Sequence, residues 1–167
     1  MATMTHRTLA PTRSAARALT WRDWTLGATA ALTVYSAGVA WQAQAVSYPL
    51  FGEVGAADFA AYHLAYDAAI PWVVIVPGFV GFLAAAALPW TRPTDVPRPL
   101  AAVVAAGGLV SLGVTMLWAI PMHDRLDAAG FSADVLDSLL RANAVRTGAL
   151  TVAAVALVGA LLRRRAA

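Results

Sequence analysis

The chain has 167 residues, of which 60% are apolar and only 13% are charged, with a formal net charge of +3. A soluble domain carries about 25% charged residues, so this composition excludes an ordinary water-soluble protein as well as disordered and collagen-like chains. The absence of cysteine excludes disulfide frameworks, thiolate nucleophiles and thiolate metal sites. We therefore predict an all-α integral membrane protein whose main partner is the lipid bilayer.

The first 22 residues are polar and rich in arginine, and we expect residues 1–22 to form a disordered cytoplasmic extension. One alternative stays open at this point. Arginines followed by an apolar run that ends near Ala43-Gln44-Ala45 are also compatible with a signal peptide and its small-residue cleavage site.

Four apolar stretches follow, each long enough for a transmembrane helix, which needs about 20 residues. They predict a four-transmembrane-helix bundle over residues 23–163, with helices at about 24–46, 58–90, 99–120 and 133–162, and a basic tail at 164–167. Tryptophans near the ends of the first three stretches are typical of the two membrane interfaces.

The charges indicate how this bundle is oriented. Nine of the 12 arginines lie on the side of the two termini, whereas seven of the nine acidic residues lie on the opposite side. By the positive-inside rule both termini are cytoplasmic, which predicts a multi-pass protein of the plasma membrane, the inner membrane of a bacterium. The acidic outer face argues against a nucleic-acid partner, because it would repel phosphate.

The segment that leads into the second span carries His63 and Asp67 one helical turn apart. A carboxylate beside an imidazole fixes its tautomer and raises its basicity, which suits a general base or a metal ligand. The alternative is an interfacial hydrogen bond that satisfies two polar groups.

The last helix carries Asn143 and Arg146 on or beside its apolar stripe, so both are expected to reach the interior of the bundle. A buried arginine needs an acidic partner or carbonyl groups, and Asp67 and Glu53 are the candidate partners. The alternative for Arg146 is that it extends to the interface without a specific partner.

A second histidine, His123, directly follows the third span and lies at the same expected membrane level as His63. Two histidines with nearby carboxylates could hold a metal ion in an open site of nitrogen and oxygen ligands. The alternative is two loop histidines that face water.

Two further features have structural interpretations. Asp137 and Arg141 lie off the apolar stripe and should form an exposed ion pair. Gly107, Ser111 and Thr115 form a ridge of small residues, which favours close helix packing either within the chain or in a homo-oligomer.

Four short motifs occur in order along the chain, at the ends of successive helices. They are Tyr48-Pro49-Leu50-Phe51, Phe59-x-x-Tyr62-His63, Pro121-x-His123-x-x-Leu126 and Asn143-x-x-Arg146-Thr147. In these motifs the chain resembles a family of small, largely uncharacterised four-helix bacterial membrane proteins, which is itself similar to the domain-of-unknown-function family that includes anthrone oxygenases. The resemblance implies a four-helix bundle with a polar pocket at the outer face and, by distant analogy, oxidation of an apolar aromatic substrate without an organic cofactor.

Three functions remain in play from the sequence. The first is an oxygenase-like membrane enzyme in which His63, oriented by Asp67, removes a proton from an apolar small molecule, while Arg146 and Asn143 stabilise the oxyanion. The second is a noncatalytic bundle, either an accessory subunit or a lipid- or quinone-binding protein. The third, transport, is disfavoured because no charged residue lies at mid-depth of a span.

Overall fold

The computed structural model describes residues 18–166, and all regular structure in this range is helical. At three places in the chain a short π-helical segment, written η, lies between two α-helices. In chain order the elements are α1 (Trp21–Gln42), η1 (Ala43–Ser47), α2 (Tyr48–Phe51), α3 (Phe59–Ala69), η2 (Pro71–Ile75), α4 (Val76–Thr91), α5 (Arg98–Val114), η3 (Thr115–Ala119), α6 (Ile120–Ala129) and α7 (Ala133–Ala166).

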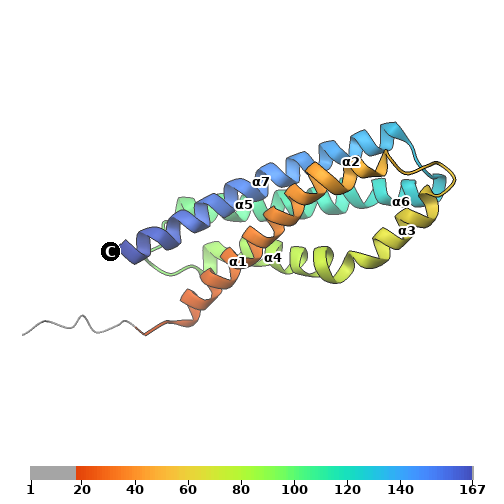
Figure 1. Cartoon of the computed structure of the whole chain (residues 1–167). Coiled ribbons are helices and arrows are strands. Elements are labelled where there is room, and N and C mark those ends of the chain that lie inside the picture. The colour runs from red at the N-terminus through yellow and green to blue at the C-terminus, as the bar shows by residue number, and fades with distance from the viewer. Residues whose placement is uncertain (1–17, 167) are drawn as a thin grey trace, which may run out of the picture.

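The long helices lie side by side along one axis (Figure 1). Helix α1 packs against α4 and α7, and α5 packs against the same two helices. Helices α3 and α6 extend the structure at the end opposite the C-terminus and contact each other there (Figure 1). This arrangement places the loops before α3 and after α6 next to one another.

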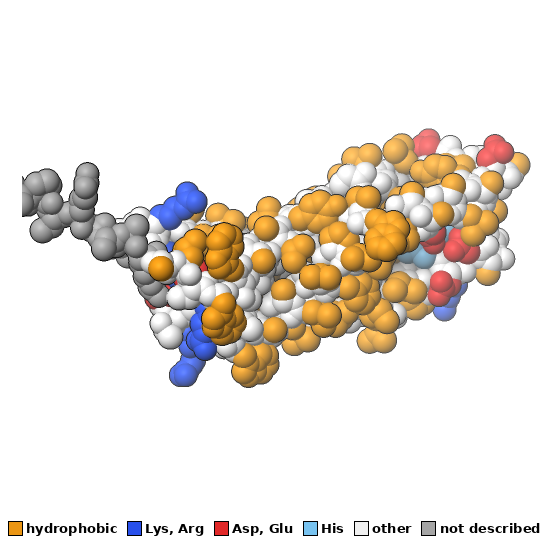
Figure 2. Space-filling model, turned by 90° about the horizontal axis from the view of Figure 1, so that it is seen from below, with side chains coloured by type: hydrophobic (Ala, Val, Ile, Leu, Met, Phe, Trp, Pro, Cys, Tyr) orange, Lys and Arg blue, Asp and Glu red, His pale blue; other side chains and the backbone are white. Residues whose placement is uncertain are grey.

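Three helical stretches are long and apolar enough to cross a membrane: Pro71–Thr91, Arg98–Ala129 and Ala133–Ala166. Helix α1 is not among them; it turns Thr29, Thr33 and Ser36 into the interior. Large apolar side chains cover the surface between a basic end and an acidic end (Figure 2). These features are those of a multi-pass membrane protein.

The π-helical segments share one local cause. Each ends two residues before a proline, namely Pro49, Pro77 and Pro121. Proline has no N–H and its ring clashes with the carbonyl four residues earlier, which in each case belongs to the middle residue of the π segment. The wider turn carries the helix past this residue without ending it.

In the second of these segments the freed carbonyl has a partner from another helix. Pro77 cannot donate to the carbonyl of Val73, and the hydroxyl of Tyr35 on α1 donates to that carbonyl at 2.7 Å. The proline therefore creates an acceptor through which α1 is joined to η2.

The ridge of small residues on α5 packs against other helices of the same chain. A Cβ atom at Gly107 would lie 2.9 Å from the carbonyl oxygen of Ala149 on α7, and one at Gly108 would lie 2.7 Å from that of Phe82 on α4. Ser111 on α5 and Thr115, the first residue of η3, are buried. Glycine thus lets α5 approach both neighbours closely.

The helix ends differ from the expected ones at four places, and one of them is the end of the first helical stretch, which continues through η1 and α2 to Phe51 instead of ending at residue 46. A capping box between Thr20 and Asp23 starts the first helix at Trp21, within the expected extension; the rest of that extension, residues 1–17, lies outside the described residues. The third helix continues past Pro121 to Ala129 and ends at Gly130, whose φ is +79°. The last helix continues to Ala166 through the expected tail.

Candidate functional site

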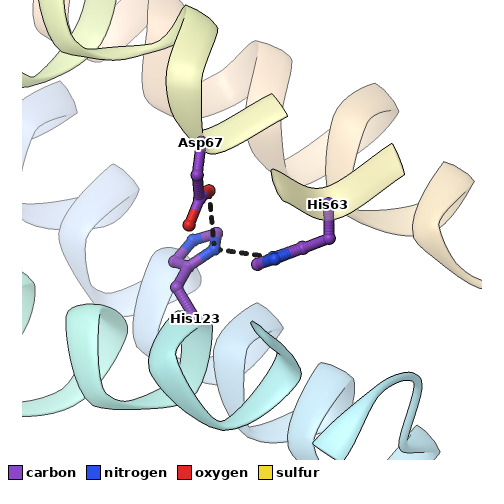
Figure 3. A group of neighbouring side chains, drawn as sticks. All are labelled: His63, Asp67 and His123. Atoms are coloured by element: carbon purple, nitrogen blue, oxygen red, sulfur yellow. Dashed lines mark hydrogen bonds and ion pairs between the residues drawn. The ribbon is translucent and has the colours of Figure 1, made fainter. Parts of the chain in front are cut away.

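Three side chains converge at the acidic end of the structure. His63 and Asp67 come from α3 and His123 from α6, and all three point into the space between these helices (Figure 3). Nε2 of His63 lies 3.0 Å from Nδ1 of His123, and that Nδ1 lies 3.5 Å from Oδ1 of Asp67. One ligand atom from each residue lies within 4.8 Å of the other two.

The second nitrogen of each imidazole also has a partner. Nδ1 of His63 lies 2.6 Å from Oδ1 of Asp127, and Nε2 of His123 lies 3.2 Å from the hydroxyl of Tyr48. The prediction that Asp67 orients His63 is therefore wrong: Asp127, one turn after His123 on α6, holds that position. Sequence reasoning missed Asp127 because it ended the third helix at residue 120.

In the absence of a bound ion, the hydrogen bonds are consistent with one assignment of which nitrogen of each imidazole carries the proton. An ionised Asp127 accepts from Nδ1–H of His63, which leaves Nε2 of His63 as an acceptor. His123 then donates from Nδ1, and its Nε2 accepts from Tyr48. Burial raises the pKa of the Tyr48 hydroxyl, against the opposing charge of Arg146, so Tyr48 remains a donor at neutral pH.

Aromatic rings enclose the imidazoles. The ring of Phe59 stacks on His63 with centroids 5.5 Å apart, and the ring of Tyr66 stacks on His123 at 6.2 Å. Phe51 meets His63 edge-on at 5.2 Å. His63 is fully buried as a result. Such surroundings hold the rings in one orientation and strengthen the polar contacts between them.

A cavity of about 200 Å³ lies beside this cluster. Its wall includes Asp67, His123, Tyr48 and Arg146, and the remainder is mostly apolar. His63 is not part of the wall; it lies behind His123. A molecule in the cavity would meet His123 first, so His63 is not positioned to take a proton from it directly.

Asn143 and Arg146 of α7 form a second polar group, of which Arg146 lines the cavity. Asn143 is buried and donates to the carbonyl of Ala40 at 3.0 Å and to Oε1 of Gln44 at 2.8 Å, while its own oxygen accepts from Arg146. Neither expected partner, Asp67 or Glu53, forms an ion pair with Arg146; nor does any other acid between residues 18 and 166.

The donor set fits a divalent transition metal. Two imidazole nitrogens and one carboxylate oxygen are typical ligands for zinc, iron or manganese, and three protein ligands leave further positions open. Oδ1 of Asp67 is buried and accepts no hydrogen bond from residues 18–166. Burial raises the pKa of the Asp67 carboxyl to about 6, while a charge on His63 acts in the opposite direction.

Metal binding and the hydrogen-bonded chain require different tautomers of His123. A metal would take Nε2 of His63 and Nδ1 of His123, while the Nδ1–H of His63 still donates to Asp127. His123 would then carry its proton on Nε2 and donate to the hydroxyl of Tyr48. The same four residues, His63, His123, Asp127 and Tyr48, can thus serve either state.

In a comparison with known proteins, no family model, curated protein or solved structure matches the chain.

Proposed function

We propose that this protein is a membrane enzyme that holds a divalent metal ion with His63, His123 and Asp67 and acts on a small apolar molecule in the adjoining cavity. The observation that carries the proposal is the convergence of three ligand atoms within 4.8 Å, with the second nitrogen of each imidazole held by its own partner. Such outer partners are the usual companions of metal-bound histidines.

A purely structural role explains this geometry less well. A buried carboxylate oxygen with no hydrogen bond is costly unless something positively charged completes it. The other ligands of such an ion would be Nε2 of His63 and Nδ1 of His123. These two nitrogens face each other, and Nδ1 of His123 also faces the carboxylate of Asp67. The side of the cluster formed by Asp67 and His123 borders the cavity, where open metal positions could meet a substrate.

The chain's own residues have separate roles in this proposal. Asp127 holds His63 in the tautomer that offers Nε2 to the metal, and Tyr48 does the same for Nδ1 of His123. Arg146, positioned by Asn143, stabilises negative charge on the bound molecule. The metal would supply Lewis acidity. The resemblance to the anthrone-oxygenase-like family favours an oxidoreductase with dioxygen as oxidant.

The membrane arrangement is part of the same proposal. We propose that α1 is a fourth span beside the three apolar stretches, that both termini lie in the cytoplasm, and that the cavity opens toward the outer face of a bacterial plasma membrane. The unequal distribution of arginine supports this orientation.

The direct test is metal content. Protein purified in mild detergent after supply of zinc, iron and manganese should carry near-stoichiometric metal by inductively coupled plasma mass spectrometry. His63→Ala, His123→Ala and Asp67→Asn should each lose it, while Asp134→Asn, an exposed acid at the same end of the structure, should not. Metal-free wild-type protein after all three supplies would refute the metal centre.

A noncatalytic bundle is the second candidate. The continuous chain Tyr48–His123–His63–Asp127 joins α2, α3 and α6, as a structural lock would. In that case Tyr48→Phe or Asp127→Ala should lower the melting temperature of the protein, because a buried member of this chain loses its hydrogen-bond partner. A binding or catalytic site predicts little loss of stability, or a gain.

A further inference from the structure

Arg146 is a buried cation that forms no ion pair with any residue between 18 and 166. Its side chain comes from the middle of α7 and is 7% exposed. One terminal nitrogen donates to Oδ1 of Asn143, which is neutral, and Nε has no hydrogen-bond partner among residues 18–166. An arginine so buried is costly unless an anion or several acceptors complete it.

The contacts of Asn143 keep this guanidinium in place. Its amide nitrogen donates to two acceptors on the first helical stretch, the carbonyl of Ala40 and Oε1 of Gln44. The amide oxygen is thereby turned toward Arg146. Asn143 is a positioning residue: it orients the guanidinium but adds no charge to neutralise it.

Arg146 borders two neighbouring hollows whose walls are mostly apolar. Arg146 lines the cavity of about 200 Å³ and also a narrow cleft of about 20 Å³ that shares Val39, Val74 and Thr115 with it. The cleft runs between α1 and α4, and Ser36 in its wall is buried with its hydroxyl unpartnered. The walls thus offer two incomplete polar groups, Arg146 and Ser36, in mostly apolar surroundings, while the carboxylates of Asp67 and Asp124 line only the larger cavity.

We propose that Arg146 binds the oxygen of an amphiphilic organic anion, a carboxylate or a phenolate, whose compact apolar body fills the adjoining cavity. This inference rests on the proposed function, because it names the substrate class of the same cavity. The mostly apolar wall disfavours a hydrated inorganic anion. An organic anion can pack its apolar body against this wall and place its charge beside the guanidinium.

The test compares two ligands of nearly the same shape. Naphthoate carries a carboxylate and naphthamide a neutral amide. Their binding to the wild-type protein in detergent is measured by equilibrium dialysis against empty micelles. A hydrogen bond to a charged group contributes about 1.5–3 kcal/mol, so we expect naphthoate to bind about 10- to 100-fold more tightly than naphthamide. Equal affinities, or no saturable naphthoate binding, would overturn the proposal.

Variants on one helix supply the matched controls. Arg146→Gln should lose about 10-fold or more of the naphthoate affinity and none of the naphthamide affinity. Arg141→Gln makes the same charge change at an exposed position five residues earlier on α7 and should leave both affinities unchanged. Arg146→Lys keeps the charge and should retain part of the preference for naphthoate, also if the glutamine variant does not fold. Wild-type naphthoate affinity in Arg146→Gln would contradict the proposal, and saturable displacement by inorganic phosphate would overturn the organic class.

Metal content separates this inference from the proposed function. Naphthoate binding is measured after chelator treatment and again after metal is restored. Anion selectivity that depends on Arg146 in a protein that never binds metal would remove the metal centre and keep the anion site. Stoichiometric metal without selectivity for the carboxylate would do the reverse.

Discussion

Nδ1 of His63 lies 2.6 Å from Oδ1 of Asp127, a residue 64 positions later in the chain. The contact joins α3 to α6 and determines which nitrogen of His63 faces His123 and Asp67. Asp127 thus selects the tautomer of a histidine it does not adjoin in sequence, and the geometry of the candidate metal centre depends on it.

Removal of this carboxylate should weaken metal binding without removing a ligand. Loss of an outer partner of a metal-bound histidine typically costs about 10- to 100-fold in metal affinity. We expect Asp127→Asn to reduce zinc affinity by this factor in a competition titration with a chromophoric chelator. Asp134→Asn is the control, and equal affinities in the two variants would contradict the role of Asp127.

Metal binding should move one proton. In the metal-free protein His123 donates from Nδ1 to His63, whereas with metal its proton lies on Nε2 and is donated to Tyr48. Nitrogen-15 spectra of selectively labelled histidine should show this change of tautomer when zinc is added. A His123 that keeps its Nδ1 proton in the presence of zinc would show that Nδ1 is not the ligand atom, which the proposed centre requires.

Because α5 closely approaches its neighbours, we expect alanine substitutions at different glycines to differ in their effect on stability. Gly107→Ala places a methyl group 2.9 Å from the carbonyl oxygen of Ala149 and from Cβ of Ala153, which should lower the free energy of unfolding by about 1–3 kcal/mol. Gly148→Ala has no such neighbour and should leave stability unchanged or increase it. Melting temperatures in one detergent compare the two directly.

Pro77 and Tyr35 should be energetically coupled. The hydroxyl of Tyr35 donates to the carbonyl of Val73, which Pro77 deprives of its usual donor. Tyr35→Phe should therefore cost about 1 kcal/mol of stability in the wild type and less in a Pro77→Ala background, where residue 77 can donate. A double-mutant cycle measures the difference; strict additivity would show that Pro77 does not create the acceptor.

At the basic end, Asp23 should stabilise the protein in a pH-dependent manner. Hydrogen bonds from Thr20 and then Arg164 hold the pKa of Asp23 well below its ordinary value. The folded chain therefore keeps this carboxylate charged at a pH where the unfolded chain protonates it. The stabilisation is fully present above the ordinary carboxyl pKa of about 3.9 and is lost as the pH falls below it.

The measurement is the melting temperature of the wild type against Asp23→Asn. We expect the wild type to be more stable at pH 7 and the difference to shrink as the pH falls below about 4. Asp137→Asn breaks the exposed pair with Arg141 and should change little at either pH. A difference for Asp23→Asn that is constant with pH would rule out the carboxylate as its source.

Residue spacing predicted some, but not all, of the residues of the candidate site. His63, Asp67 and His123 were identifiable as polar residues at the ends of apolar stretches, and the structure brings them together. The exposed pair of Asp137 and Arg141 is confirmed. Asp127 escapes the sequence analysis because the third helix is expected to end at about residue 120, whereas it passes through a π-helical segment and continues to Ala129.

The sequence by itself determined that this is a helical protein with membrane-spanning segments. Its apolar stretches, small-residue ridge and separated charges are properties of single segments, and a bilayer imposes helix on each of them. The tertiary structure decided which polar groups meet. Each π-helical segment adds one residue to a turn and so rotates all later side chains by about 100°, a shift that helical periodicity does not anticipate. The pairing of His63 with Asp127 depends on that rotation and on how α3 and α6 pack, whereas the lack of an ion-paired acid for Arg146 among residues 18–166 depends on how α7 packs.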